Sequence, residues 1–143
     1  FSSNKNNDYL TQFDGSLQNF GKTDISFSPN LIFGNSIEFK MNDKTLLFFN
    51  TKYVGKQYMS NTNVESSVLA SYLVNDLGIN HSFSIPGFSD DSELKLLINN
   101  LFNQKYESYG GHYFYDIDNK TYSGAYFYPM AEINFLIGLD FNF

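Results

Sequence analysis

The residue types that most often perform catalysis are few in this chain and lie far apart. There is no cysteine, and the two histidines, His81 and His112, are isolated from each other. Nucleophilic catalysis needs a nucleophile held beside a base, and no spacing in this sequence predicts such a pair. We therefore expect no catalytic residues and no enzymatic activity.

One short segment has the composition of a cation-binding loop. Asp116-Ile117-Asp118-Asn119 offers side-chain oxygen atoms at close spacing. Lys120, however, stands where a calcium loop needs another oxygen ligand, and no bidentate glutamate follows at the required distance. We expect no metal and no cofactor at this segment.

Tyrosine is the residue type best suited to ligand binding in this chain. The stretch from Glu107 to Met130 is rich in Tyr and Gly and has a turn signal, Asp118-Asn119-Lys120, in its middle. We interpret it as a long loop that itself forms a hairpin. Its rings either stack on a sugar or siderophore, or pack as a loop and as a girdle at a membrane interface, which is the commoner role. The possible substrate contacts are Tyr109, Tyr113, Tyr115, Tyr126 and Tyr128.

Composition narrows the class of protein. The net charge of -6 argues against nucleic acid as a partner, because phosphate binding needs a basic stripe. The absence of cysteine excludes a disulfide framework and a thiolate metal site. No apolar run approaches the roughly 18 residues of a membrane-spanning helix, whereas a barrel strand needs only about 9–11 residues of alternating character.

The last thirteen residues alternate strictly between apolar and polar side chains. Every odd position from Ala131 to Phe143 is apolar, and among the even positions only Leu136 is apolar. Successive side chains of a strand point to opposite faces, so this segment predicts a strand with one apolar and one polar face.

Four further segments complete a set of five predicted strands. Alternation is clear from Phe27 to Met41, and two more strands follow at Thr45–Tyr58 and Val68–Phe83. The segment Glu93–Phe102 fits a helical stripe at least as well, but its neighbours favour a strand that runs to about Tyr106. We expect short turns at Asn42–Lys44 and Ile85–Ser92, longer loops at Ser60–Ser66 and Glu107–Met130, and a polar, irregular loop over residues 1–24.

Long two-faced strands joined alternately by short turns and long loops are typical of an outer-membrane barrel. In that arrangement the short turns are periplasmic and the long loops are extracellular. Five strands cannot close such a barrel, because the smallest have about eight and an open edge in lipid leaves backbone groups without partners. We therefore expect this chain to be part of a larger assembly.

Three segments resemble the C-terminal strands of TonB-dependent receptors, most closely those of the Bacteroidetes. They are Lys52-Tyr53-Val54-Gly55-Lys56-Gln57-Tyr58, Asn99-Asn100-Leu101-Phe102-Asn103-Gln104-Lys105-Tyr106, and Tyr128-Pro129-Met130-Ala131 continuing to Leu139. The resemblance covers roughly residues 22–143. It implies the end of a barrel of about 22 strands, plugged by an N-terminal domain that is not in this chain.

The resemblance also implies a function and partners. Such receptors import scarce nutrients across the bacterial outer membrane with energy delivered by TonB, and the barrel assembly machinery folds them. That machinery recognises a terminal signal of the form polar-x-Gly-x-x-hydrophobic-x-aromatic, which Gly138, Phe141 and Phe143 match and Leu136, at the polar position, does not. The expected partners are outer-membrane lipid, the rest of the barrel and its plug, TonB through the missing N-terminal part, and the assembly machinery.

Two alternatives stay open. A soluble β-sandwich that binds carbohydrate through its Tyr-rich loop would have shorter strands and would bury two apolar faces against each other. In the second alternative, the chain is a fragment bound as a client of the assembly machinery, and its terminal strand pairs with a strand of another protein. Polar side chains such as Lys40, Lys52, Asp76 and Glu132 would in a barrel face the lumen, where they hydrate it, pair with the plug or contact substrate.

Overall fold

The chain is all β. The computed structural model describes residues 1–142. Strands make up 65% of the chain, and within the described residues the one helical turn is a 3-10 turn at Glu65–Ser67 (η1). The chain divides into two compact units. We call residues 33–53, 73–105 and 131–142 the sheet unit, and residues 1–32, 54–72 and 106–130 the loop unit.

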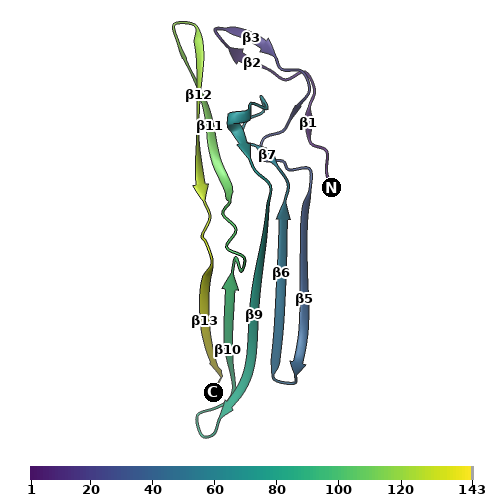
Figure 1. Cartoon of the computed structure of the whole chain (residues 1–143), viewed down its shortest axis with the longest axis vertical. Helices are drawn as coiled ribbons and strands as arrows, with labels where there is room; N and C mark the ends of the chain where they lie inside the picture. The colour runs from purple at the N-terminus through teal and green to yellow at the C-terminus, as the bar shows by residue number, and fades with distance from the viewer. Residues whose placement is uncertain (143) are drawn as a thin grey trace. The chain divides into compact units, whose positions relative to one another are not determined.

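The sheet unit is built on one five-stranded sheet, drawn in Figure 1. Its strand order is β13-β10-β9-β6-β5, and the β9–β10 and β10–β13 pairs are antiparallel. Short turns after Asn42 and Ile85 join β5 to β6 and β9 to β10. The strands are β5 Ile32–Asn42, β6 Thr45–Val54, β9 Tyr72–Ile85, β10 Ser89–Asn99 and β13 Asn134–Asn142.

The registers divide the side chains of the sheet between two faces. Leu94, Leu96 and Ile98 of β10 lie opposite Leu139, Ile137 and Phe135 of β13, and opposite His81, Ile79 and Leu77 of β9. Side chains that are directly opposite in a pleated sheet project to the same face. We call this the apolar face.

Charged side chains of the central strands project to the other face, which we call the polar face. Glu93 lies opposite Asp140, and Lys95 lies opposite Gly138. The Lys95 ammonium forms ion pairs with the carboxylates of both Glu93 and Asp140.

The apolar face has no covering layer among residues 1–142. Ile137 is 74% exposed and Phe135 is 66% exposed, although their side chains belong to the strongest alternating segment of the sequence. The buried hydrophobic side chains of the described residues, Val54, Met59, Leu69 and Tyr72, all belong to the loop unit. The sheet therefore presents a hydrophobic surface without a core of its own.

The loop unit consists of short strand pairs and one long hairpin. The hairpin pairs β11 with β12 over almost their whole lengths, and Asp118 and Asn119 in its turn both have positive φ (49° and 61°). Two central residues with positive φ form the tight turn that suits the twist of a hairpin. The strands are β11 Glu107–Ile117, β12 Lys120–Pro129, β1 Lys5–Asn6, β2 Leu10–Phe13, β3 Ser16–Asn19, β4 Thr23–Asp24, β7 Gln57–Tyr58 and β8 Val68–Leu69.

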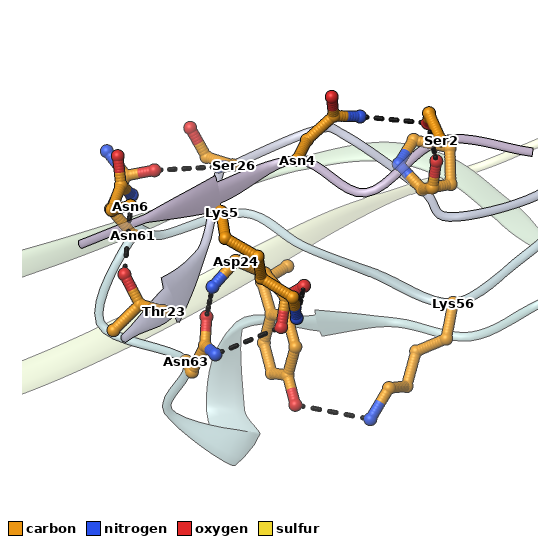
Figure 2. Close-up of polar contacts among 12 residues, drawn as sticks. Ser2, Asn4, Lys5, Asn6, Thr23, Asp24, Ser26, Lys56, Asn61 and Asn63 are labelled. Atoms are coloured by element: carbon orange, nitrogen blue, oxygen red, sulfur yellow. Dashed lines mark hydrogen bonds and ion pairs between the residues drawn. The ribbon is translucent and has the colours of Figure 1, made fainter. Parts of the chain in front are cut away.

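Side-chain amides of Asn61 and Asn63 hold the N-terminal segment to the loop before η1, and an ion pair between Lys5 and Asp24 joins β1 to β4 within that segment (Figure 2). The Asp24 carboxylate pairs with the ammonium of Lys5 and accepts a hydrogen bond from the Asn63 amide at 3.1 Å. The Asn63 and Asn61 side-chain oxygens accept the backbone N–H groups of Asp24 and Ser26 at 3.0 and 2.7 Å. These contacts satisfy backbone donors that have no strand partner.

The structure corrects several of the predicted boundaries. The strand predicted at Thr45–Tyr58 is divided into β6 and β7, and the strand predicted at Val68–Phe83 is divided into β8 and β9. Residues 1–24 are not irregular: Asp14 and Gly15 form a tight turn with positive φ between β2 and β3. The strand predicted from Phe27 begins at Ile32, because Phe27 has a φ of 52° and lies outside it. The terminal strand begins at Asn134 rather than Ala131, and Phe143 lies outside the described residues.

Other expectations are confirmed. The ambiguous segment Glu93–Phe102 is a strand, but it ends at Asn99 instead of running to about Tyr106, because the left-handed backbone of Asn100 begins a turn; the Tyr-rich stretch is a hairpin. The turn predicted over Ile85–Ser92 is shorter, because β10 already begins at Ser89 and reaches its regular register at Ser92 after an irregularity. No helix in the described part of the chain is long and apolar enough to cross a membrane.

Candidate functional site

Six tyrosines share one face of the β11–β12 hairpin. The paired positions on this face are Tyr109 with Tyr128, Gly111 with Tyr126, Tyr113 with Gly124, and Tyr115 with Tyr122. Since each of these positions is two residues from the next along its strand, all eight positions face the same side of the hairpin. We call this surface the tyrosine face; its members are Tyr109, Gly111, Tyr113, Tyr115, Tyr122, Gly124, Tyr126 and Tyr128.

The two glycines of the tyrosine face leave room for tyrosine rings. A Cβ atom on Gly111 would overlap the phenol end of Tyr126, and a Cβ atom on Gly124 would overlap that of Tyr113. Each of these rings therefore lies across the strand pair and occupies the space above the facing glycine. Any side chain at either glycine would displace a ring, so both glycines are needed for this arrangement.

The rings of the tyrosine face contact one another in two groups. Tyr115 stacks with Tyr122 at 5.6 Å between ring centroids and 18° between planes, and Tyr113 lies beside Tyr115 at 6.2 Å. Tyr109 stacks with Tyr128 at 6.0 Å and 12°. The six rings are each about half exposed, which leaves much of their surface available to a ligand.

The reverse face of the hairpin is packed against other parts of the loop unit. A Cβ atom on Gly110 would overlap the Met59 sulfur atom, and the Phe114 ring packs edge-on against Phe13 at 5.8 Å. At the hairpin end, the Thr121 backbone N–H donates to an Asp14 carboxylate oxygen at 2.7 Å, and the Asp14 N–H donates to the Thr121 hydroxyl at 2.6 Å. These contacts hold one face of the hairpin. On the tyrosine face, the Phe27 ring stacks on Tyr109 at 5.3 Å between ring centroids.

His112, on the reverse face, is the one histidine of the loop unit. Its Nε2 atom lies 3.0 Å from the Ser66 hydroxyl, a contact that the sequence did not predict. Its Nδ1 atom is buried and has no hydrogen-bond partner within the described residues. Burial lowers the pKa of this imidazole. Because no acidic group orients Nδ1, the Ser66–His112 contact lacks the third member of a nucleophilic triad, and we assign it a packing role.

The acidic segment at the hairpin turn is used in hydrogen bonding. An Asp116 carboxylate oxygen accepts a hydrogen bond from the Thr121 hydroxyl at 2.5 Å, and Asp118 and Asn119 form the turn itself. The described residues contain no group of three or more His, Cys, Asp or Glu side chains that could hold a metal ion.

The terminal strand β13 contains two of the three predicted assembly-signal residues. Phe141 projects to the apolar face and packs edge-on against Phe88 at 5.7 Å. Gly138 projects to the polar face, where a Cβ atom would make only an ordinary contact with the Lys95 Cβ at 3.6 Å. The sheet itself therefore does not require glycine at this position. The third residue, Phe143, lies outside the described residues.

β13 and β5 form the two edges of the sheet. β13 pairs with β10 along one of its edges, and its other edge has no strand neighbour among residues 1–142. The Asn142 carbonyl accepts a hydrogen bond from the Ser89 hydroxyl at 2.6 Å, which fixes the end of β13 against the start of β10. An edge of this kind is suited to strand addition.

Three of the four polar residues expected to face the lumen of a barrel have partners in the structure. The Asp76 carboxylate accepts the backbone N–H of Asn100 at 2.9 Å, so it is part of a turn. Lys40 pairs with Asp43 and Glu132 pairs with Lys105, in both cases at exposed positions. Ion pairs in such positions contribute little to stability.

Asn100, from the segment that resembles the receptor family, organises the turn after β10. Its backbone is left-handed (φ 51°) and its side chain is 3% exposed. The side-chain amide donates to the Gln104 carbonyl at 2.9 Å and to the Ala131 carbonyl at 3.1 Å, and the side-chain oxygen accepts the Gln104 N–H at 2.8 Å. One asparagine thus satisfies three backbone groups that have no strand partner.

The sequence identified five of the six tyrosines but missed Tyr122 and both glycines of the tyrosine face. The missing information was the position of the turn, because only the pairing about Asp118 and Asn119 brings Tyr122 opposite Tyr115. Comparison with known proteins found no protein family, no curated protein and no solved structure that matches this chain.

Proposed function

We propose that this chain forms the last strands of a TonB-dependent outer-membrane receptor, a barrel that imports a scarce nutrient and whose terminal strand carries the assembly signal. The observation that supports the proposal most strongly is the five-stranded sheet with an apolar face that no described residue covers. Strands of nine to 14 residues have the length needed to cross the hydrocarbon layer of a bilayer.

The energetics favour lipid as the covering layer. Fully burying one Leu, Ile or Phe side chain contributes about 1.5–3 kcal/mol, so a face lined by such residues on three neighbouring strands is costly to leave in water. A lipid-facing sheet must also exclude charge from that face. In the regularly paired segments Ser92–Asn99 of β10 and Asn134–Phe141 of β13, the charged residues are Glu93, Lys95 and Asp140, and all three project to the polar face.

The open edges favour a larger barrel. A strand edge in lipid has no water to satisfy its N–H and C=O groups, and only closure removes both edges. The proposal therefore assigns β5 and β13 to contacts with further strands of the same barrel, with lipid on the apolar face and the plug, TonB and the assembly machinery as further partners. A soluble sandwich would need a second large sheet against the apolar face, whereas every other sheet of the described residues has only two strands.

Membrane fractionation and heat-modifiable electrophoresis test the proposal. The native protein that contains this chain is expected in the outer-membrane fraction, and an unheated sample should migrate faster than a boiled one. Replacing Phe141 and Phe143 with Ser should remove the folded species from the membrane without reducing synthesis. The matched control is Phe102→Ser, which changes an exposed phenylalanine outside the strands.

Two results would count against the proposal. One is recovery of the native protein in the soluble fraction after membrane removal. The other is normal heat-modifiable protein in the membrane after both terminal phenylalanines have been replaced, which would remove the assembly role from Phe141 and Phe143 specifically.

A further inference from the structure

The alternating side chains of β13 fix its two faces but leave its register open in steps of two residues. A shift of one residue would move the apolar side chains to the polar face, whereas a shift of two residues keeps them on the apolar face. Leu96, which pairs with Ile137 in the structure, would after such a shift lie opposite Leu139, another apolar residue. Side-chain alternation therefore does not by itself select the observed pairing of β10 with β13.

The charges on the polar face do not select the register either. The observed register places Glu93 directly opposite Asp140, and like charges in this position are destabilising. Lys95 forms ion pairs with both carboxylates, but a shift of two residues would place it directly opposite Asp140. Since Lys95 has an acidic partner in both registers, other contacts must decide between them.

Side chains at the end of β10 hold the start of β13. The Asn99 amide donates to the side-chain oxygen of Asn134, its pairing partner, at 2.9 Å. Asn100, which is 3% exposed, donates from its amide to the Ala131 carbonyl at 3.1 Å. The same shift of two residues would place Leu136 opposite Asn99, and a leucine side chain offers no acceptor.

A third asparagine extends these contacts. The Asn103 side-chain oxygen accepts the Ile133 N–H at 2.9 Å. Residues 131–133 lie outside the strands, so their backbone groups do not repeat with the two-residue period of a strand. A shift of β13 would therefore separate Asn100 and Asn103 from their backbone partners without supplying equivalent ones.

We propose that Asn99, Asn100 and Asn103, which we call the asparagine clamp, set the register in which β13 pairs with β10. The clamp lies in the segment Asn99–Tyr106 that resembles the receptor family, and the proposal gives three asparagines of that segment a physical role. As a device that aligns the last strand of a barrel, the clamp rests on the proposed function, because strand register and barrel size are linked. The register itself depends only on the sheet.

Disulfide formation in the native protein, with other cysteines removed, measures the register. Leu94→Cys with Leu139→Cys places two cysteines directly opposite in the observed register, and Leu96→Cys with Leu139→Cys places them opposite only after the shift. Cysteines whose Cα atoms are more than about 7 Å apart do not form a disulfide without backbone movement. With the clamp intact, oxidation should therefore link the first pair and not the second.

Removing clamp side chains should raise the share of the shifted disulfide. Asn99→Ala and Asn100→Gly each delete one hydrogen bond that depends on the register. One such bond corresponds to about a fivefold change in an equilibrium, so each variant should raise the ratio of the second disulfide to the first by about that factor. The double variant should raise the ratio further. Asn35→Ala, in β5 at the other edge of the sheet, is the matched control and should leave the ratio unchanged.

The proposal is overturned by an unchanged ratio in the clamp variants, or by an equal rise in Asn35→Ala. General destabilisation would lower both disulfide yields together and leave their ratio unchanged, so it also counts against the clamp. Where Asn100→Gly fails to reach the membrane, Asn99→Ala, which leaves the hydrogen bonds of Asn100 in place, decides the question.

Heat-modifiable migration measured on the same samples separates the two proposals. A protein whose disulfides shift as predicted but which is not heat-modifiable contradicts only the proposed function. A heat-modifiable barrel whose disulfide ratio does not respond to the clamp variants contradicts only the asparagine clamp.

Discussion

Replacing Asn100 should destabilise the turn after β10 more than any other single change in that segment. The side chain makes three hydrogen bonds to backbone groups and is almost fully buried. Each bond contributes about 1 kcal/mol net, so Asn100→Gly, which keeps the left-handed backbone accessible, should cost about 3 kcal/mol. Asn100→Ala adds the strain of a Cβ atom in the left-handed region, about 1–2 kcal/mol more.

Hydrogen exchange of the native protein measures this cost locally. The reporters are the backbone N–H groups of Gln104, bonded to the Asn100 side chain, and of Asn100, bonded to Asp76. A loss of 3 kcal/mol corresponds to about a hundredfold drop in protection where exchange follows local opening. Asn100→Ala should lose about tenfold more.

Asn103→Gly is the matched control. Asn103 also has a left-handed backbone (φ 51°), but its side chain accepts only the Ile133 N–H, at an exposed position. The expected cost is about 1 kcal/mol or less. Equal protection losses in Asn100→Gly and Asn103→Gly, or unchanged protection at Gln104 in Asn100→Gly, would refute the assignment of Asn100 as the organising residue of this turn.

Two further predictions concern other contacts. Burial lowers the pKa of His112, so opening of the hairpin is linked to proton uptake by this imidazole. The closed hairpin has its full stability above pH 6.5, the ordinary pKa of histidine, and loses stability as the pH falls from 6.5 toward the lowered pKa. The protection factors of β11 amides, which are corrected for the intrinsic exchange rate, should therefore fall as the pH is lowered below 6.5 in the native protein and not in His112→Gln; identical pH profiles of protection would contradict the buried-imidazole assignment. A Cβ atom on Gly78 would overlap the Phe48 ring, so Gly78→Ala should cost about 1–3 kcal/mol, and Phe48→Ala in the same chain should remove most of that added cost. Additive effects of these two substitutions in urea unfolding would exclude the direct contact.

The sequence predicted the strands of the sheet better than it predicted their ends. Alternation between Phe135 and Phe141, broken only at Leu136, fixes both the strand and its two faces, because one register places the other apolar side chains on a single face. The starts of β5 and β13 were placed too early, since Phe27 and Ile133 continue the alternation although their backbone does not pair. Periodicity reports on side chains, whereas the end of a strand depends on backbone hydrogen bonds.

The hairpins of the loop unit show a different limit. Asp14-Gly15 is a strong signal for a tight turn, and this dipeptide predicts a hairpin at the position of β2 and β3 although the composition of the segment is polar and irregular. The tyrosine face depends on register, because Tyr122 joins the other rings only when Asp118 and Asn119 occupy the turn. The Ser66–His112 contact joins residues 46 positions apart, and no local pattern encodes it.

The central claim is that the apolar face of the sheet contacts lipid, and fluorescence quenching by brominated lipids tests it most directly. Bimane would be attached to single cysteines in the native protein, with other cysteines removed, in vesicles of brominated phosphatidylcholine. Labels at Leu96 and Ile137 should be strongly quenched, and a label at Lys95, next in sequence but on the polar face, should not be. Equal quenching at Leu96 and Lys95, or none at Leu96 and Ile137, would contradict a lipid-facing sheet.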